Sequence, residues 1–352
     1  MIAPLLAAAV AVVLSIAGTG FMARTLRAHG QSQPILTKDA ANITAPRHEH
    51  KKGTPTMGGI AIVGAALAGY LVSHVRAGVV FSDQTLVIWV AVLAMAGIGF
   101  IDDFLKVRSG HNRGVLWSRK GWITLALAIG LAVLLLVVTD IDTRISLTRA
   151  ASPGWDFGKV AWVIWAGLIV FSTANAVNVT DGLDGLAAGA ALFAFAAFTA
   201  IAYLAFRNPE IYPAVVNPYD LTVFAAAFAG ACAGFLWWNA APADIFMGDV
   251  GALALGTALA MLGLTTNTTL LLPLLLGINV MEIGSVALQM SVYRASGRTR
   301  RLFRISPVHH HFEHGGWPET KVIIRFWLIA GMSVATAMAI FFADFTHQAQ
   351  GR

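Results

Sequence analysis

The sequence predicts an all-α integral membrane protein with about ten transmembrane helices. Hydrophobic residues make up 57% of its 352 residues and charged residues only 12%. The mean hydropathy is +0.71, and this combination lies far outside the range of soluble domains. Apolar segments long enough to cross a hydrocarbon core of about 30 Å recur along the whole chain. Because no linker or long internal repeat separates them, residues 1–352 are expected to form a single polytopic membrane domain.

Ten segments have the length and composition of membrane spans. They cover residues 2–23, 57–78, 84–101, 121–139, 159–177, 186–206, 219–238, 251–266, 270–293 and 323–344. The ninth segment differs from the others because it contains Pro273, Gly277 and Gly284, which interrupt regular helical structure. We therefore expect the ninth helix to be broken or kinked.

The positive charges predict the orientation of the chain in the membrane. Arg24 and Arg27 follow the first apolar run rather than precede it, which favours a retained helix that starts outside over a cleaved signal peptide. With that start, 18 of the 24 Lys and Arg residues lie on the cytoplasmic side and 6 on the other. This excess agrees with the positive-inside rule and predicts that both termini are periplasmic.

The net charge and the cysteine content give no support for nucleic-acid binding or for cysteine-based chemistry. The net charge of +6 arises from basic residues that flank the spans, where membrane orientation and attraction to anionic lipid explain them. Nucleic acid is therefore not an expected partner. The single Cys232 lies within the seventh span and indicates a small buried residue rather than redox or metal chemistry.

Under this topology the cytoplasmic ends of the spans carry five polar clusters. The first is HKKGTPTMGG, in which Lys51 and Thr56 belong to a loop rich in glycine. The backbone amides of such a loop can approach an anion closely. A basic anchor followed by the start of a helix would produce the same pattern, so this cluster alone leaves both interpretations open.

The second cluster, GFIDDFLKV, ends the third span with Asp102 and Asp103. Ionised neighbours at the edge of a membrane repel each other and lose hydration. Lys106 is in i,i+4 range of Asp102 and i,i+3 range of Asp103, so it compensates part of this charge. Lys120, beyond the next loop, fits a membrane anchor and a phosphate ligand equally well. A divalent cation or a substrate is an open source of the remaining positive charge.

The third cluster lies in NAVNVTDGLDGLAAG, between the fifth and sixth spans. Asn178, Asp181 and Asp184 follow one another at i,i+3 spacing, but from Asn175 to Asp184 a regular helix turns by half a revolution. Two glycines in this stretch allow the helix to break, so that a loop could gather all four side chains round one ligand. The alternative is a polar turn, which does not account for an asparagine inside the apolar boundary.

The fourth and fifth clusters follow the seventh and ninth spans. WWNAAPADIFMGDVGALALG carries Asn239 and Asp249, and the latter enters the eighth span between two glycines, as suits a metal-binding carboxylate. FRISPVHHHFEHGGWPE carries His309, His310 and His311, which cannot all face one point on a helix. A structural zinc site is disfavoured because the Cys/His spacing is missing. Imidazoles that contact phosphate or carboxylate fit better.

Together the five clusters indicate phosphoryl chemistry at the membrane surface. Carboxylate oxygens without thiolates favour Mg²⁺ or Mn²⁺ over softer metals. Basic residues beside such a metal suit a diphosphate that undergoes in-line attack. No Walker A loop is present, which argues against ATP hydrolysis. A reaction at the lipid boundary also suggests that one reactant is a lipid.

The chain contains, in this order, the motifs KKGTPTMGGI, GFIDDFLKV, NAVNVTDGLDGLA, FMGDVGALALG and SPVHHHFEHGGWPETKVIIRFW. These motifs closely resemble the phospho-N-acetylmuramoyl-pentapeptide-transferase family, within the superfamily of polyprenyl-phosphate hexose-1-phosphate transferases. The resemblance implies ten transmembrane helices, an active site on the cytoplasmic face of the bacterial cell membrane, a Mg²⁺ cofactor and a homodimer. It also implies transfer of phospho-MurNAc-pentapeptide from UDP-MurNAc-pentapeptide to undecaprenyl phosphate, which forms lipid I and UMP in peptidoglycan biosynthesis.

The same resemblance implies roles for individual residues. The catalytic set is Asp102 as candidate base, Asp103, Asp249 and His309, and the metal set is Asp249, Asp102 and Asp103. The substrate-binding set is Lys51, Thr56, Lys106, Lys120, Asn175, Asn178, Asp181, Asp184, Asn239, His310 and His311. Outside these positions the resemblance is weaker, and residues 28–46 and 140–158 carry no recognisable motif.

Several alternatives remain open at the level of the sequence. The lipid phosphate could attack the sugar-bearing phosphorus directly, which we favour because it is already an anionic nucleophile. An aspartate could instead attack first and form a covalent intermediate. A UDP-GlcNAc-type transferase is a rival within the superfamily. An ion-coupled transporter is a rival from another class, but it predicts polar residues in mid-span, where Glu282 is the main exception.

Overall fold

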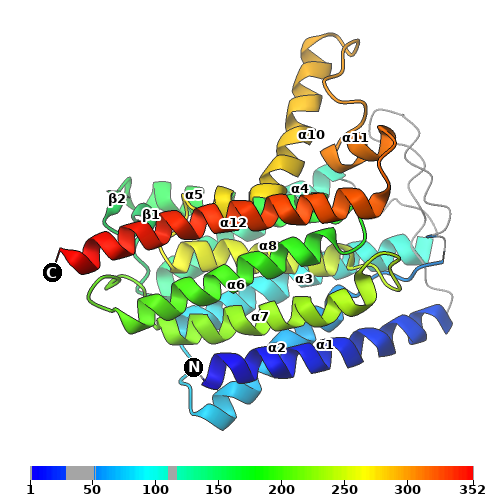
Figure 1. Ribbon diagram of the computed structural model, residues 1–352. Helices are drawn as coiled ribbons and strands as arrows, with labels where there is room; N and C mark the ends of the chain where they lie inside the picture. The colour runs from blue at the N-terminus through cyan, green and yellow to red at the C-terminus, as the bar shows by residue number, and fades with distance from the viewer. Residues whose placement is uncertain (1, 29–50, 52, 110–116, 352) are drawn as a thin grey trace.

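The computed structural model describes residues 2–28, 51, 53–109 and 117–351, and this part of the chain is almost entirely helical (Figure 1). The helices are α1 (Ile2–Ala28), α2 (Gly59–Ala77), α3 (Asp83–Ser109), α4 (Trp117–Val138), α5 (Gly158–Thr180), α6 (Leu186–Arg207), α7 (Pro218–Asn239), α8 (Gly248–Thr265), α9 (Leu272–Leu275), α10 (Gly277–Ala295), α11 (Val308–His314) and α12 (Glu319–Gln350). One antiparallel hairpin joins β1 (Ile145–Arg149) to β2 (Ser152–Trp155).

Nine of the described helices, α1 to α8 and α12, are long and apolar enough to cross a membrane. The prediction of an all-α integral membrane protein is therefore confirmed. The predicted ninth span is broken, as expected, into the single turn of α9 and the longer α10. Pro273 opens α9, and α10 begins at Gly277. Figure 1 shows α10 leaving the bundle at a steep angle to the other long helices.

The centre of the bundle is α8, in which every residue from Asp249 to Thr265 is buried. It packs against α2, α3, α5 and α6. A helix that is apolar on all sides belongs in a core, because no face of it needs contact with solvent or lipid. As a consequence, the carboxylate of Asp249 in the first turn of α8 lies in the middle of one end of the bundle.

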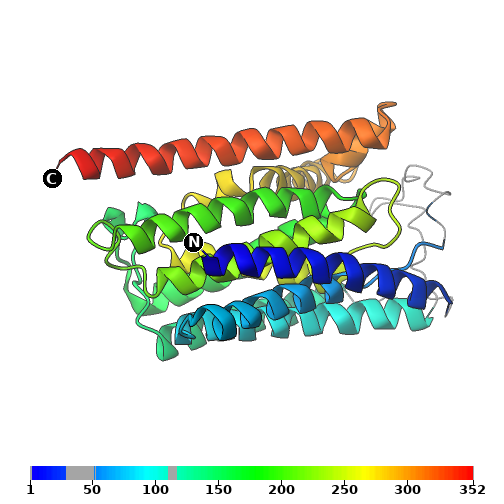
Figure 2. The same ribbon diagram turned by 60° about the horizontal axis from the view of Figure 1, so that its bottom comes forward.

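The last long helix, α12, forms an outer layer and packs on α6, α9 and α10 (Figure 2). Both chain termini lie at one end of the bundle, whereas α11 and the start of α12 lie at the other (Figure 1). Termini at a common end agree with the sequence-based topology. Which end faces the cytoplasm remains a prediction from the positive charges.

Three local features differ from the sequence-based expectation. The third span was expected to end at residue 101, but α3 continues to Ser109 and carries the second polar cluster on a helix. The hairpin and α11 were not predicted. The hairpin depends on a distant partner, because Thr148 and Arg149 both bind the carboxylate of Asp344 on α12. Such contacts leave no periodic signal in the local sequence.

Candidate active site

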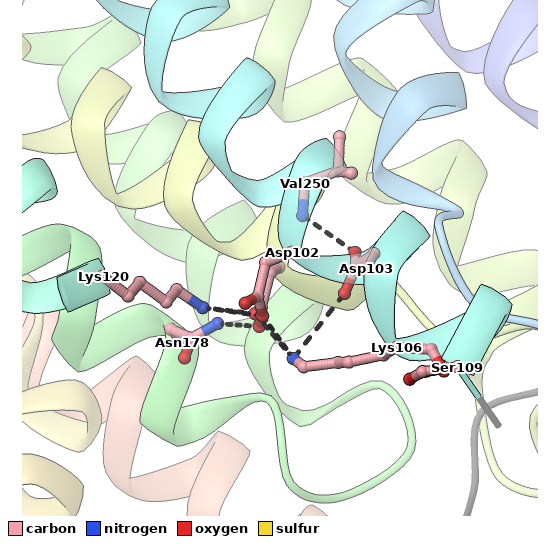
Figure 3. Close-up of polar contacts among 8 residues, drawn as sticks. Asp102, Asp103, Lys106, Ser109, Lys120, Asn178 and Val250 are labelled. Atoms are coloured by element: carbon pink, nitrogen blue, oxygen red, sulfur yellow. Dashed lines mark hydrogen bonds and ion pairs between the residues drawn. The ribbon is translucent and has the colours of Figure 1, made fainter. Parts of the chain in front are cut away.

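Side chains from four helices meet at the end of the bundle opposite the termini. They are Asp102, Asp103 and Lys106 on α3, Lys120 on α4, Asn178 on α5 and Asp249 on α8. Figure 3 shows the two lysines reaching the carboxylates from opposite sides. The prediction that these distant motifs converge is confirmed by the geometry, although the role of each residue remains a prediction.

Two glycines permit the close approach of α3 and α8. A Cβ at Gly99 would clash with the backbone carbonyl of Asp249, so only glycine allows α3 to lie this close to the start of α8. Gly248 has φ +74°, in the left-handed region that favours glycine. A Cβ there would clash with the Asp103 carboxylate. Both contacts bring the carboxylates of α3 beside Asp249.

The two lysines share the carboxylates of this cluster. Lys106 Nζ lies 2.6 Å from Asp102 Oδ2 and 2.8 Å from Asp249 Oδ2. Lys120 Nζ lies 3.2 Å from Asp102 Oδ2 and also pairs with Asp249 Oδ2. Asn178 donates from Nδ2 to Asp249 Oδ1 over 2.5 Å. Asp249 is therefore the hub, with two ammonium groups and one amide on its carboxylate.

Asp103 is held differently from the other two aspartates. Its Oδ2 accepts the backbone N–H of Val250 at 3.2 Å, whereas its buried Oδ1 has no hydrogen-bond partner among the described residues. Lys106 Nζ lies 3.9 Å from Oδ1. The buried hydroxyl of Thr56 likewise lacks a hydrogen-bond partner within the described ranges. Unpartnered buried oxygens are rare in folded proteins, and they are free to bind a ligand.

The cluster fits a divalent cation. Ligand oxygens of Asp102, Asp103 and Asp249 all lie within 4.8 Å of one another, and oxygen-only donors suit Mg²⁺. Within the part of the chain that the structure describes, the ion pairs of this cluster join three carboxylates to two ammonium groups, so negative charge is in excess. Asp249 also lies at the amino end of α8, where the helix dipole contributes only partial positive charge. The arrangement therefore favours the binding of further positive charge.

Asp181 lies beside this cluster, in the turn between α5 and α6. Its side chain is half-buried, and loss of hydration raises the pKa of its carboxyl group to about 8. The negative charges of Asp249, Asp103 and Asp184 raise this pKa further, while the backbone N–H of Gly248 acts against them. Below pH 8 the group therefore tends to hold a proton, and a bound cation would favour its release.

A second buried cluster joins the same turn to the start of α12. Lys51 Nζ lies 2.8 Å from Asp184 Oδ1 and 2.5 Å from Glu319 Oε1. The other oxygen of Asp184 accepts the backbone N–H of Ala243 at 2.9 Å. The turn is thereby tied to the segment that precedes α8. Lys52 of the same motif lies outside the described residues.

Asn239 and the loop that holds Thr56 complete this framework. Asn239 accepts the Gly185 N–H at 3.0 Å and donates to the Ile245 carbonyl at 2.9 Å. Pro55 accepts the backbone N–H of Phe246 at 2.8 Å. These bonds fix the loop before α2 against the segment before α8, so that the Thr56 hydroxyl lies close to Gly248.

The histidine run forms the start of α11. His309 is fully buried and its ring lies against Gly182 in the turn between α5 and α6. His310 Nδ1 lies 2.6 Å from Glu313 Oε2. His311 accepts the backbone N–H of Arg304 at 3.1 Å, and its pKa is lowered by burial and by the charge of Arg304. The three imidazoles thus have three different surroundings.

The hydrogen bond of Asn175 stays within its own helix. Asn175 donates to the carbonyl of Phe171 one turn earlier in α5. Glu319 was missed by the sequence analysis, although it closes the Lys51 cluster. Its position in the sequence could have identified it, because it is the acidic residue that follows the histidine motif and begins the last long helix.

Comparisons with known proteins agree with this geometry. A model of glycosyl transferase family 4 matches residues 85–267, and the phospho-N-acetylmuramoyl-pentapeptide-transferase signature 1 matches residues 51–63. The phospho-N-acetylmuramoyl-pentapeptide-transferase of Frankia casuarinae is 40% identical over 99% of each chain. The enzymes of that name from Mycobacteroides abscessus and Mycobacterium leprae are 42% and 41% identical, each over 97% of both chains.

The chain belongs to the phospho-N-acetylmuramoyl-pentapeptide-transferase family. It is therefore a multi-pass membrane transferase. The matched regions contain Lys51 and Thr56 in the signature, and the Asp102, Asp181 and Asp249 motifs in the longer model. The histidine run lies beyond both matches and is covered by the full-length relatives of the family.

Proposed function

We propose that this protein transfers phospho-MurNAc-pentapeptide from UDP-MurNAc-pentapeptide to undecaprenyl phosphate, forming lipid I and releasing UMP. The reaction would take place at the cytoplasmic face of the bacterial cell membrane. The observation that carries this proposal is the convergence of Asp102, Asp103 and Asp249 with Lys106 and Lys120 at one end of a membrane bundle. Membership of the family supports the same substrates.

The acidic cluster is the proposed Mg²⁺ site. Asp249, Asp102 and Asp103 would hold the ion, which supplies positive charge to the oxygens of a diphosphate when it is bound. Lys106 and Lys120 at present share two carboxylates. These two ammonium groups would also contact the phosphate oxygens of the donor and stabilise the charge that develops during transfer.

The proposed transfer is a direct in-line displacement. An oxygen of the lipid phosphate forms a bond to the phosphorus that carries the sugar. The bond from this phosphorus to the bridging oxygen breaks, and the electron pair leaves with UMP. Asp102 would accept the proton of the lipid phosphate, which requires little basicity because the second pKa of a phosphate monoester is about 6.

The turn between α5 and α6 would bind the nucleotide. Asn178 and Asp181 lie beside the acidic cluster, and Asp184 is fixed by Lys51. The side chains of His310 and His311 would contact the donor from the neighbouring α11. The homodimer implied by the family resemblance also remains a proposal, and molar-mass measurement in detergent tests it separately.

Assay of the purified protein tests the proposed function. We expect Mg²⁺-dependent UMP release from UDP-MurNAc-pentapeptide only when a polyprenyl phosphate is present. Release of UMP without the lipid would instead indicate a covalent intermediate or hydrolysis. Turnover of UDP-GlcNAc in place of the muramoyl donor would overturn the substrate assignment, and the absence of UMP release from every sugar nucleotide would overturn the proposal altogether.

A further inference from the structure

One buried acid of the chain has no part in the proposed transfer. Glu282 lies in the second turn of α10 and is 0% exposed. Burial of a carboxylate is costly unless another charge or donor compensates for it. Among the described residues, the ion-pair partner of Glu282 is His309, whose Nδ1 lies 3.0 Å from Glu282 Oε2 and which is itself 0% exposed.

The opposite edge of the His309 ring faces the predicted nucleotide-binding turn. A Cβ at Gly182 would clash with His309 Nε2, so glycine is required opposite the ring. Within the described ranges, neither nitrogen of His309 and neither oxygen of Glu282 has a hydrogen bond of good geometry. A fully buried pair of this kind indicates a group held ready for a ligand or a reaction.

The inner face of α10 holds the pair in place. Asn279, one turn before Glu282, donates from Nδ2 to Thr180 Oγ1 over 3.0 Å. Thr180 is the last residue of α5, immediately before the turn that contains Gly182. Asn279 and Glu282 are three residues apart and share a helix face. The break before α10 therefore turns a polar face of this helix toward α5 and α11.

We propose that Glu282 is a positioning residue that orients His309. Its Oε2 lies 3.0 Å from Nδ1, so a small turn of the ring lets the carboxylate accept the Nδ1–H. This bond fixes the tautomer and directs Nε2 toward the turn of residues 181–185. Carboxylates commonly orient histidines in this manner at reactive sites. His309 then presents Nε2 to the phosphate-bearing donor that this turn binds, so the inference rests on the proposed function.

The test is Glu282→Gln, which removes the charge but keeps the size of the side chain. We expect kcat for UMP release to fall by about tenfold to a hundredfold, the usual effect of losing a partner that orients a histidine. The KM for the sugar nucleotide should stay within about twofold of the wild-type value. Glu282→Asp keeps the charge and should recover part of kcat. Glu210→Gln, at an exposed glutamate between α6 and α7, is the matched control and should behave as wild type.

A double-mutant cycle separates positioning from a structural role. If Glu282 acts through His309, Glu282→Gln causes no further loss of kcat in a His309→Ala background. An equal loss in both backgrounds, or wild-type kcat for Glu282→Gln, overturns the inference. If Glu282→Gln fails to fold, the same cycle is run with Glu282→Asp. A loss of kcat for Glu282→Asp that is equal with and without His309 would again overturn the inference.

The wild-type assay distinguishes failure of this inference from failure of the proposed function. Wild-type turnover together with an unaffected Glu282→Gln variant rejects the positioning role alone. If the wild-type protein instead uses a different sugar nucleotide, the proposed donor is wrong, and the double-mutant cycle is carried out with the donor that is used.

Discussion

Two buried acidic sites at opposite ends of the bundle are built in opposite ways. At the far end of α2, Asp220 Oδ2 accepts the Ser82 N–H at 2.9 Å, the Ser82 hydroxyl at 2.7 Å and the Tyr70 hydroxyl at 3.2 Å. Its Oδ1 lies 3.0 Å from His74 Nε2. At the candidate active site, by contrast, Asp103 Oδ1 has no hydrogen-bond partner among the described residues.

The difference gives a criterion that separates a structural carboxylate from a candidate ligand-binding one. Asp220 receives donors from Tyr70 and His74 on α2 and from Ser82 in the loop before α3, and a satisfied network of this kind rigidifies the fold. The carboxylates at the other end share two lysines and retain an excess of negative charge. Burial alone does not separate the two sites, since Asp102, Asp103 and Asp220 are all 1–2% exposed. What separates them is the buried Oδ1 of Asp103, which has no hydrogen-bond partner among the described residues, whereas both oxygens of Asp220 have partners.

The largest expected effect is on catalysis, at the end of the bundle that holds the candidate active site. Asp249→Asn removes the hub of the acidic cluster and should lower kcat by about a thousandfold, because positive charge would no longer be held at the transferring phosphorus. Chelation of divalent cations from the wild-type protein should abolish UMP release in the same assay. Thermal stability of the metal-free protein should change little, since relief of the repulsion with Asp103 offsets the loss of the ion pairs with Lys106 and Lys120. A marked loss of stability would show that Asp249 is structural, like Asp220.

At the Asp220 end of the bundle we expect a loss of stability without a loss of turnover. Asp220→Ala removes the acceptor that four donor groups share, and loss of a buried partner of this kind costs about 3 kcal/mol. Thermal unfolding in detergent should therefore shift to lower temperature. Turnover per folded molecule, measured well below the transition, should match the wild type. A large fall in that turnover would show that Asp220 also affects catalysis, and it would contradict a purely structural role for this residue.

Replacement of a lysine sharpens the comparison within the active site. Lys120→Met should reduce kcat by about a hundredfold, because one cation that can contact the phosphate is lost. It should also destabilise the metal-free protein, since Asp102 and Asp249 lose a counter-charge. Added Mg²⁺ should recover the stability but not kcat. Lys159→Met, at an exposed lysine near the start of α5, is the matched control.

The smallest expected effect is a pH dependence of stability. The pKa of Asp181 in the folded protein is about 8, above its unfolded value of about 3.9. Because the folded state binds the proton more tightly, this contribution to stability is complete below pH 4 and is lost as pH rises through 8. Thermal unfolding of the metal-free protein should therefore occur at lower temperature at pH 9 than at pH 6. Asp181→Asn should reduce this difference, and an unchanged difference would contradict the raised pKa.

Much of the candidate site was predictable from the sequence, because it consists of residues that a membrane chain does not otherwise tolerate. Asp102, Asp181 and Asp249 were identified by their position at the ends of apolar spans, where an unpaired charge is costly. Glu282 was identified only as a charged residue in a span. Its partner His309 lies in a different element, and no spacing rule links residues that meet through the break before α10.

The sequence by itself determined the helices, since an apolar segment of about 20 residues satisfies its backbone hydrogen bonds internally whatever surrounds it. It also determined the chemical types of the site residues and, through the family, the class of the enzyme. Which groups meet depends on the tertiary structure. Asp102 and Asp249 share two lysines because Gly99 lets α3 lie against α8, and Lys51 reaches Glu319 across 268 residues of chain. Contacts of this kind follow from the packing of whole helices, which no local pattern of residues encodes.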